Sequence, residues 1–188
     1  MKSRTVLSAF LLLGALGCAS TSNRPRVDPR EIVGRPVSAA VDVPVELEHE
    51  QVAVAQLACG GAFATRLGPS QKVVHFRLRI RNLDPAPVAV PLDSLSLEGV
   101  TGGALTHPLA LVGQERAGQA IAIAAGASRE IDVIFQLPDA VDLDEVNGFT
   151  LTWGLEVAGH LVANKISFAA AANEPGTGRV ARAFRPSI

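Results

Sequence analysis

Residues 73–82 have the sequence VVHFRLRIRN and decide the fold. From Val74 onward, apolar and polar side chains alternate along this stretch. The apolar set is Val74, Phe76, Leu78 and Ile80, and the polar set is His75, Arg77, Arg79 and Arg81. A period of two residues predicts a β-strand with one buried face and one solvated face. The turn-forming stretch that follows, Asn82 to Pro87, predicts where the strand ends.

Working outward from this strand, the same alternation recurs between clusters of Gly, Pro and Asp. It predicts further strands at residues 43–50, 88–97, 105–112, 119–124, 129–137, 149–157 and 160–168. Pro91 cannot donate to a strand ladder, so we expect the 88–97 strand to be kinked or to lie at a sheet edge. Ala158-Gly159 predicts a tight hairpin turn. Residues 138–147 are acidic and irregular, with at most one helical turn begun by Asp142.

Many short strands with regular turns and no convincing helix predict an all-β antiparallel sandwich of about seven to nine strands. Residues 73–168 resemble immunoglobulin-like domains of uncharacterised bacterial lipoproteins. The resemblance rests on the turn at Asn82-Leu83-Asp84, on Pro91-Leu92-Asp93-Ser94-Leu95, on Ala125-Gly126-Ala127-Ser128 before the next strand, and on the Trp153 hairpin. It implies the sandwich fold and implies no activity, and the inter-sheet cysteine pair of true immunoglobulin domains is absent.

The charged side chains of neighbouring predicted strands are complementary in such a sandwich. The arginines of 73–81 would meet Glu130 and Asp132 on one neighbouring strand and the row Glu46, Glu48 and Glu50 on the other. Opposite charges across strands contribute about 0.2–1 kcal/mol per pair. We therefore expect Arg77 or Arg79 to lie within salt-bridge distance of Glu130 or Asp132.

The N-terminus has the three parts of a secretory signal. Lys2 and Arg4 precede an apolar run at residues 6–13, which is shorter than the roughly 20 residues that span a bilayer. The segment Ala15-Leu16-Gly17-Cys18 resembles the lipobox of bacterial lipoproteins, with Ala15 where Leu is usual. The resemblance implies cleavage after Gly17 and lipidation of Cys18. The alternative is ordinary secretion with a chance cysteine.

Four segments follow from this interpretation. Residues 1–17 are the signal peptide, 18–34 the lipidated N-terminus and linker, 35–170 the sandwich domain, and 171–188 a tail expected to lack regular structure. Because residue 19 is Ala and not Asp, the lipoprotein resemblance implies an outer-membrane location facing the periplasm. The arginines of linker and tail would either touch anionic headgroups or be ordinary solvated charges.

The domain offers no catalytic, metal or cofactor motif. Residues 31–170 carry 9 basic and 16 acidic side chains, a balance of 9 − 16 = −7, which with the absence of Tyr argues against nucleic-acid binding. His49, His75, His107 and His160 are scattered without ligand spacing. Asp142-Leu143-Asp144 partly resembles the start of a calcium-binding loop. However, Val146 and Trp153 occupy positions of that loop that need oxygen ligands. Gly60-Gly61 and Gly102-Gly103 are interpreted as turns, and Cys59 as a buried, inert thiol.

The sequence therefore predicts a non-enzymatic accessory or protein-interaction module without a cofactor, attached to the membrane through Cys18. The partner would bind at a sheet edge near Val88–Val90 or at the acidic loop of residues 139–145. The alternative is a binder of small apolar ligands in a cleft between the sheets.

Overall fold

The alternating stretch forms β3 (Lys72–Asn82), which lies at the centre of the first of two antiparallel sheets. The structure is a computed structural model and describes residues 37–38, 40–65, 71–100, 103–106, 110–112, 120–170, 181–182 and 184–187. The first sheet has the order β1-β2-β3-β9-β7, with β12 paired to β2. Its other strands are β1 (Val41–Leu47), β2 (Glu50–Ala64), β7 (Ala110–Val112), β9 (Ser128–Gln136) and β12 (Ala181–Arg182).

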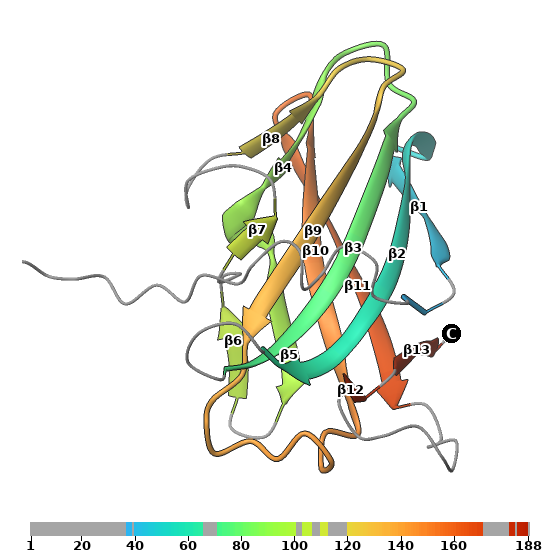
Figure 1. The fold of residues 1–188 in the computed structure, drawn as a ribbon. Helices are drawn as coiled ribbons and strands as arrows, with labels where there is room; N and C mark the ends of the chain where they lie inside the picture. The colour runs from blue at the N-terminus through green and yellow to red at the C-terminus, as the bar shows by residue number, and fades with distance from the viewer. Residues whose placement is uncertain are drawn as a thin grey trace, which may run out of the picture.

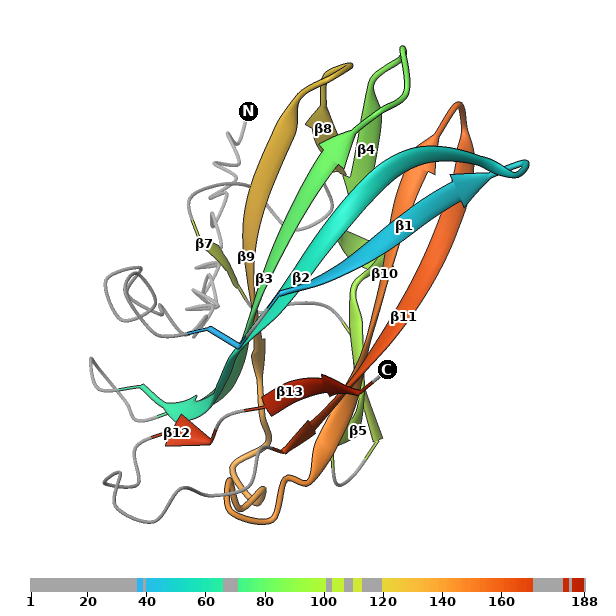
Figure 2. The ribbon, with the colours of Figure 1, turned by 90° about the vertical axis from the view of Figure 1, so that its right-hand side faces the viewer.

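The second sheet has the order β13-β11-β10-β4-β8, with β5 paired to β10 and β6 paired to β5. Its strands are β4 (Val88–Pro91), β5 (Ser96–Val100), β6 (Gly103–Thr106), β8 (Ala120–Ile123), β10 (Gly148–Val157), β11 (His160–Ala170) and β13 (Phe184–Ser187). Figure 1 shows the first sheet in front of the second, and Figure 2 shows the two layers from the side. The predicted all-β sandwich is confirmed.

The core lies between the layers and is centred on Phe76. Its ring meets Phe135 of the same sheet at 6.1 Å between centroids, and Phe149 and Phe168 of the other sheet at 5.2 and 5.4 Å. Edge-on and tilted contacts at these distances are the favourable geometries for aromatic pairs. Trp153, Leu78 and Ile80 are fully buried in the same core. The alternating apolar side chains of β3 are therefore the ones that pack against the second sheet.

The turns follow from local chemistry. At the β10–β11 hairpin, Ala158 and Gly159 have φ of 49° and 79°, as a tight hairpin turn requires. After β3, the buried side chain of Asn82 donates to the carbonyls of Ala86 and Ile123, and its Oδ1 accepts from the backbone N–H of Asp84. The sequence indicated a turn here but not that Asn82 itself is buried and ties the turn to β8.

The N-terminal half of the first sheet corrects two predictions. The strand expected at 43–50 ends at Leu47, and the chain reverses through Glu48 and His49, both with positive φ, into a long β2 that the sequence did not indicate. β2 is rich in Ala and Gly, which have low strand propensity. Glu46 is separated from β3 by β2, Glu48 lies in the β1–β2 turn, and Glu50 begins β2 before its pairing with β3 starts at Ala53. These glutamates therefore do not flank the arginines of β3.

Two other predicted strands are each divided. Residues 88–97 form β4, a short 3-10 turn at Leu92–Ser94 and then β5, because Pro91 ends the ladder and the Ser94 hydroxyl donates to its carbonyl oxygen. Residues 105–112 contribute to β6 and β7, which belong to different sheets. Residues 138–147 contain turns and no helix. The Asp142 carboxylate accepts from the N–H of Asp144 within one of these turns.

The C-terminal tail was expected to lack regular structure, and its described part contradicts this. Ala181 and Arg182 pair with Ala62 and Phe63 of β2, and residues 184–187 pair with the end of β11. Figure 2 shows β12 and β13 passing from the first sheet toward the second. The ordered fold therefore extends beyond the boundary predicted at residue 170. Residues 1–36, which include Cys18, lie outside the described part of the chain.

Phe76→Ala tests the central contact. Removing a ring that meets three others across both sheets leaves a cavity, and we expect the free energy of unfolding to fall by about 3–5 kcal/mol. Denaturant unfolding followed by Trp153 fluorescence measures the change. Leu161, which is 58% exposed on β11, provides the control, since Leu161→Ala should change stability by less than about 0.5 kcal/mol. A similar small loss for both variants would contradict a core centred on Phe76.

Candidate functional site

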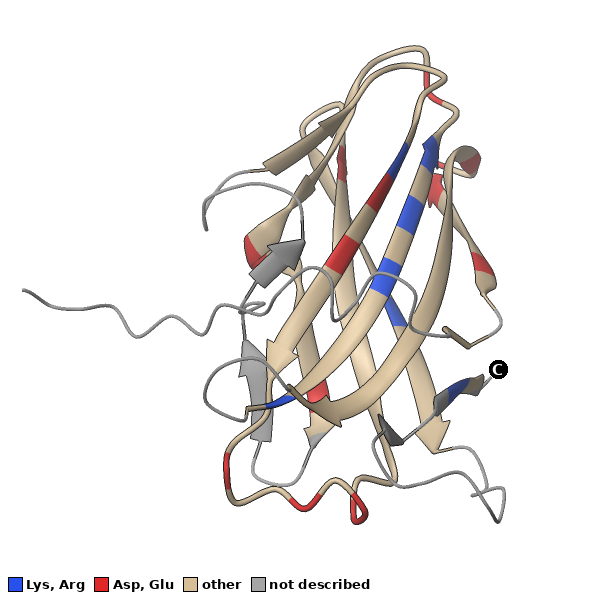
Figure 3. Ribbon diagram, viewed as in Figure 1, with Lys and Arg blue, Asp and Glu red and all other residues tan. Residues whose placement is uncertain are grey.

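The outward face of the first sheet carries the most connected polar cluster in the described part of the chain. Antiparallel register places Arg77 opposite Asp132, His75 opposite Ile134, and Arg79 opposite Glu130. Basic stretches of β3 lie directly beside acidic stretches of β9 in Figure 3. The alternation that turns Phe76 inward turns these residues to the other side.

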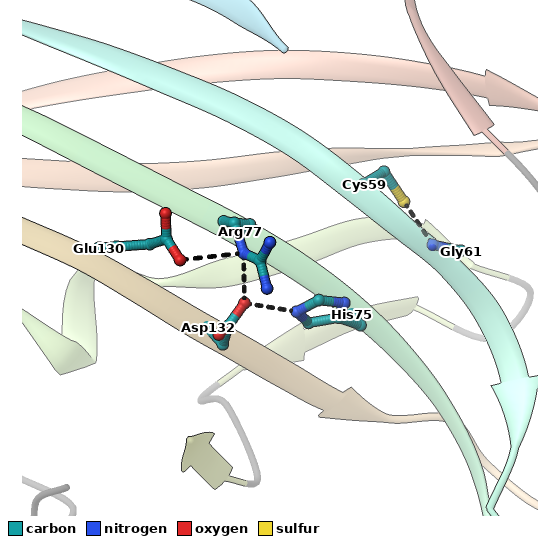
Figure 4. A network of polar contacts seen from close by, with 6 residues as sticks. All are labelled: Cys59, Gly61, His75, Arg77, Glu130 and Asp132. Carbon is teal, nitrogen blue, oxygen red and sulfur yellow. Dashed lines mark hydrogen bonds and ion pairs between the residues drawn. The ribbon is translucent and has the colours of Figure 1, made fainter. Parts of the chain in front are cut away.

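Asp132 is the centre of the cluster (Figure 4). Its Oδ1 lies 2.8 Å from Nε2 of His75 and 3.0 Å from Nε of Arg77. Nε of Arg77 also lies 3.3 Å from Oε1 of Glu130. The prediction that Arg77 or Arg79 pairs with Glu130 or Asp132 is confirmed, with Arg77 in contact with both acids.

The electrostatics favour an ionised Asp132. Partial burial by itself raises the pKa of its carboxyl group, but hydrogen bonds from His75 and Arg77, together with their charges, outweigh burial and leave the pKa below its ordinary value. The hydrogen bond between Arg77 and Asp132 also raises the pKa of Arg77. Charge-assisted hydrogen bonds in a partly desolvated site are stronger than those at an open surface.

His75 corrects the sequence prediction of a wholly solvated face. It points outward with Arg77, but its side chain is fully buried. The Asp132 carboxylate accepts, so the proton that joins the two lies on Nε2 of His75. Nδ1 has no hydrogen-bond partner and faces Gly60, where a Cβ atom would stand only 2.0 Å from it. Gly60 is therefore required so that the imidazole ring can lie over β2.

Gly60 and Gly61 are strand residues, and the prediction that they form a turn is wrong. The β2–β3 register shifts between Cys59 and Gly61, and Gly61 has a φ of 89°. This is a β-bulge, which glycine accommodates because it has no Cβ. Gly103 lies in β6, and Gly102 is outside the described residues.

Cys59 is buried as predicted. Its side chain faces the core, and desolvation raises the pKa of the thiol to about 12, although a hydrogen bond from the N–H of Gly61 at 3.2 Å partly opposes the shift. A thiol with such a pKa holds almost no thiolate at neutral pH and is a poor nucleophile. It also lies on the face of β2 opposite to His75, so the two do not form a catalytic pair.

The cluster is suited to hold β3 and β9 in register. A His–Asp pair orients a general base in hydrolases, but that chemistry needs a nucleophile at the free imidazole nitrogen. Here that nitrogen faces the backbone of Gly60. The arrangement is a cross-strand clamp that fixes the charge of Asp132 and the ring of His75.

The other candidate residues do not converge. His49 is exposed in the β1–β2 turn, His160 is exposed at the start of β11, and His107 lies outside the described residues. Within the described ranges, no group of three or more His, Cys, Asp or Glu side chains could hold a metal ion. The edge site predicted at Val88–Val90 is wrong, because β4 lies between β8 and β10 and is paired on both sides.

The acidic loop between β9 and β10 is well held although it has no regular secondary structure. Val141 and Val146 are buried in the core, and Nζ of Lys72 donates to the carbonyl oxygens of Asp139 and Val141 at 2.8 and 2.6 Å. These contacts leave several acidic side chains exposed to solvent: Asp139, Asp142, Asp144 and Glu145. In Figure 3 the loop at the lower end of the sandwich carries several acidic positions, coloured red.

Comparisons with known proteins add little beyond this geometry. No protein-family model matches the chain, and no curated protein matches it. Among solved structures, a Bacillus subtilis subsp. subtilis str. 168 protein titled "putative lipoprotein (ycdA)" is similar, with a TM-score of 0.42 and 15% sequence identity. The match covers 70% of this chain and 38% of that one. Within its described ranges the chain has no helix long and apolar enough to cross a membrane.

Asp132→Asn tests the clamp. The pKa of Asp132 is lowered in the folded state, so its stabilisation is present above the unfolded pKa of about 3.9 and is lost as the pH falls through the folded pKa. We expect the variant to be less stable by about 1.5–3 kcal/mol at pH 7. The difference from the wild type should shrink as the pH falls below 4, as measured by denaturant unfolding across that range.

Glu130→Gln is the matched control. Glu130 is half exposed, so its pair with Arg77 should contribute less than about 1 kcal/mol. Equal losses at both positions, or a loss at Asp132 that is independent of pH, would contradict the assignment of Asp132 as the centre of the cluster.

Proposed function

We propose that this chain is a lipid-anchored, non-enzymatic accessory or protein-interaction module of the cell envelope, held at a membrane through Cys18. The observation that carries the proposal is the order of the N-terminal segments. A basic start, an apolar run and the small residues before Cys18 stand directly ahead of a polar linker and a folded sandwich. Ala19 after the cysteine favours the outer membrane, with the domain facing the periplasm.

The linker sets how far the domain can lie from the lipid. Residues 19–36 separate Cys18 from the first described residue, which gives 36 − 18 = 18 residues. A flexible chain of this length has a root-mean-square span of roughly 20–25 Å. Several acyl chains on Cys18, each CH2 contributing about 0.8 kcal/mol when buried, would make the attachment stable. The domain would thus act within about one domain diameter of the membrane surface.

The acidic loop between β9 and β10 is the surface we propose for the partner. Its backbone is fixed by Lys72, Val141 and Val146, so its carboxylates are presented in a defined arrangement at little entropic cost on binding. A partner with a basic surface would be complementary to it. The His75–Asp132–Arg77 cluster supports a non-enzymatic role, because Nε2 of His75 and Nε of Arg77 both contact the Asp132 carboxylate, and Nδ1 of His75 faces Gly60.

A small apolar ligand between the sheets is the second candidate function. One observation favours it: Nε1 of Trp153 is buried in the core without a hydrogen-bond partner, and buried indole N–H groups usually have one. Against it, Phe76 and the three phenylalanine rings around it pack in the space between the sheets near β3. We therefore favour the protein-interaction module over the binder of small apolar ligands.

The anchor is tested by Cys18→Ser in the native host. We expect the variant to lose incorporation of a labelled fatty acid and to leave the membrane fraction, because the acyl chains have no other attachment point. Cys59→Ala is the control and should keep both label and membrane association. Persistence of lipid label on the Cys18→Ser chain would show that the lipoprotein assignment is wrong.

The partner surface is tested by carbodiimide crosslinking in native membranes, since this reagent joins carboxylates to amines in contact. We expect one stoichiometric adduct that is lost in Asp139→Asn/Glu145→Gln. The control is Asp93→Asn/Glu156→Gln, which neutralises two exposed acids elsewhere and should keep the adduct. The proposal fails if no adduct forms, or if both double variants crosslink equally.

A further inference from the structure

The second sheet has a long edge that is only partly covered. β11 pairs with β10 along nearly its whole length, but β13 pairs with β11 only from Ser167 to Ala170. In the described part of the chain, no strand pairs with the other side of residues 160–166. Leu161 and Ala163, in the middle of this stretch, are exposed. Residues 160–166 therefore form an edge that is open to solvent, which is called the free edge of β11 below.

One hydrogen bond fixes which backbone groups the free edge presents. Ala170 donates its N–H to the carbonyl oxygen of Asn147, which lies opposite it in the antiparallel register of β10 and β11. Bonded and non-bonded pairs alternate along such a ladder. The even-numbered residues of β11 therefore bond to β10, and the odd-numbered residues point the other way. The free edge presents the N–H and C=O groups of three residues: Leu161, Ala163 and Lys165.

Two other contacts agree with this alternation. Gly154, which lies opposite Ala163, donates its N–H to the Ser94 hydroxyl on the side of β10 away from β11. Pro186 of β13 lies opposite Phe168, an even-numbered residue whose backbone bonds to β10 and needs no donor from β13. The nitrogen of Pro186 therefore faces away from β11, and the outer edge of β13 lacks a donor at that point.

The other edge strands of the described chain are protected against pairing. β1 contains Pro44 and a register shift between Val45 and Glu46. β6, β7, β8 and β12 have four residues or fewer, and β13 is blocked at Pro186. Proline, bulges and short strands are the usual means by which proteins prevent edge-to-edge pairing. The free edge of β11 has an unbroken register and no proline. Among the described edges it is the one left available to another strand.

The side chains along the free edge suit an uncharged strand. Residues 161–164 include no charged side chain, and the ammonium group of Lys165 lies 3.8 Å from the Glu98 carboxylate. Val162 faces inward and is only partly buried against the core, while Leu161 is 58% exposed on the outer face. Apolar side chains of an added strand beside Val162 and Leu161 would remove both from water.

A second copy of this chain fits the free edge poorly. In a symmetric antiparallel pair of two β11 edges, a register that places Leu161 opposite Lys165 of the other copy brings the hairpin turn opposite Ser167. That position is already occupied by β13. A register that avoids this collision leaves only Leu161 and Ala163 hydrogen-bonded between the copies. An extended segment of another protein has no such turn and can pair along the whole free edge.

We propose that the free edge of β11 is a docking site for an extended, uncharged segment of another protein, which adds to the second sheet as a strand. Main-chain hydrogen bonds to Leu161, Ala163 and Lys165 would supply affinity, and the alternating side-chain contacts would supply specificity. β13 already pairs with the adjoining part of the same edge as an antiparallel strand (Figure 2). This site goes beyond the acidic loop proposed above, because it recognises a backbone and not a charge.

Hydrogen exchange tests whether the edge is free. The sample is the isolated full chain carrying Cys18→Ser, followed by NMR. We expect the amides of Leu161 and Ala163 to exchange at least about tenfold faster than those of Val162 and Asn164, because only the latter two bond to β10. Equal protection of all four amides would show that the chain covers its own edge, and this overturns the proposal.

Photo-crosslinking in the native host tests the docking, with p-benzoylphenylalanine in place of Leu161. We expect one discrete adduct that is lost in Ala163→Pro, which removes an N–H that β10 does not use. Ala163→Thr is the matched control, since it keeps the N–H and should keep the adduct. If Ala163→Pro does not fold, Lys165→Pro removes the next N–H of the free edge.

The outcomes separate this site from the acidic loop. Asp139→Asn/Glu145→Gln should keep the adduct at the free edge, because neither carboxylate belongs to β11. An adduct that is lost in this double variant but persists in the proline variants supports the acidic loop and overturns strand addition. The absence of any adduct, or an adduct between two copies of this chain, also overturns it.

Discussion

The ring contacts of Phe76 are the constraint on which the rest of the structure depends. Each sheet has one apolar face that must be removed from water, and neither can do this alone. Phe76 projects from the central strand of the first sheet and touches Phe149 and Phe168 of the second. Because strand side chains alternate, fixing Phe76 inward also fixes His75 and Arg77 outward. The core contact and the polar cluster are thus two consequences of one register.

The outward face has its own organisation, and it is not simply the solvated side of a sandwich. Arg77, Asp132 and Glu130 form a charged clamp across β3 and β9, while His75, Val73 and Ile134 are dry. The boundary between the dry and wet parts falls between His75 and Arg79.

Several features followed directly from sequence. The alternation at 73–82 identified the central strand, and the spacing of turns identified an all-β sandwich. The hairpin at Ala158–Gly159 was also predicted, as was an ion pair of Arg77 or Arg79 with Glu130 or Asp132, since both depend on short-range pattern and simple charge complementarity. β2 was missed because its Ala and Gly residues carry little strand signal and are held in place by β1 and β3 on either side. The strands of the C-terminal tail were missed for a related reason, because they exist only through pairing with β2 and β11.

The sequence by itself therefore determined which faces of most strands are apolar and where most turns fall. Those properties are local, because they depend on side-chain chemistry at fixed spacing along the chain. Only the tertiary structure decided that His75 is buried, that Gly60 makes room for its ring, and that β4 is not a free edge. Those properties depend on which strands become neighbours, and neighbours distant in sequence are selected by the packing of the whole fold.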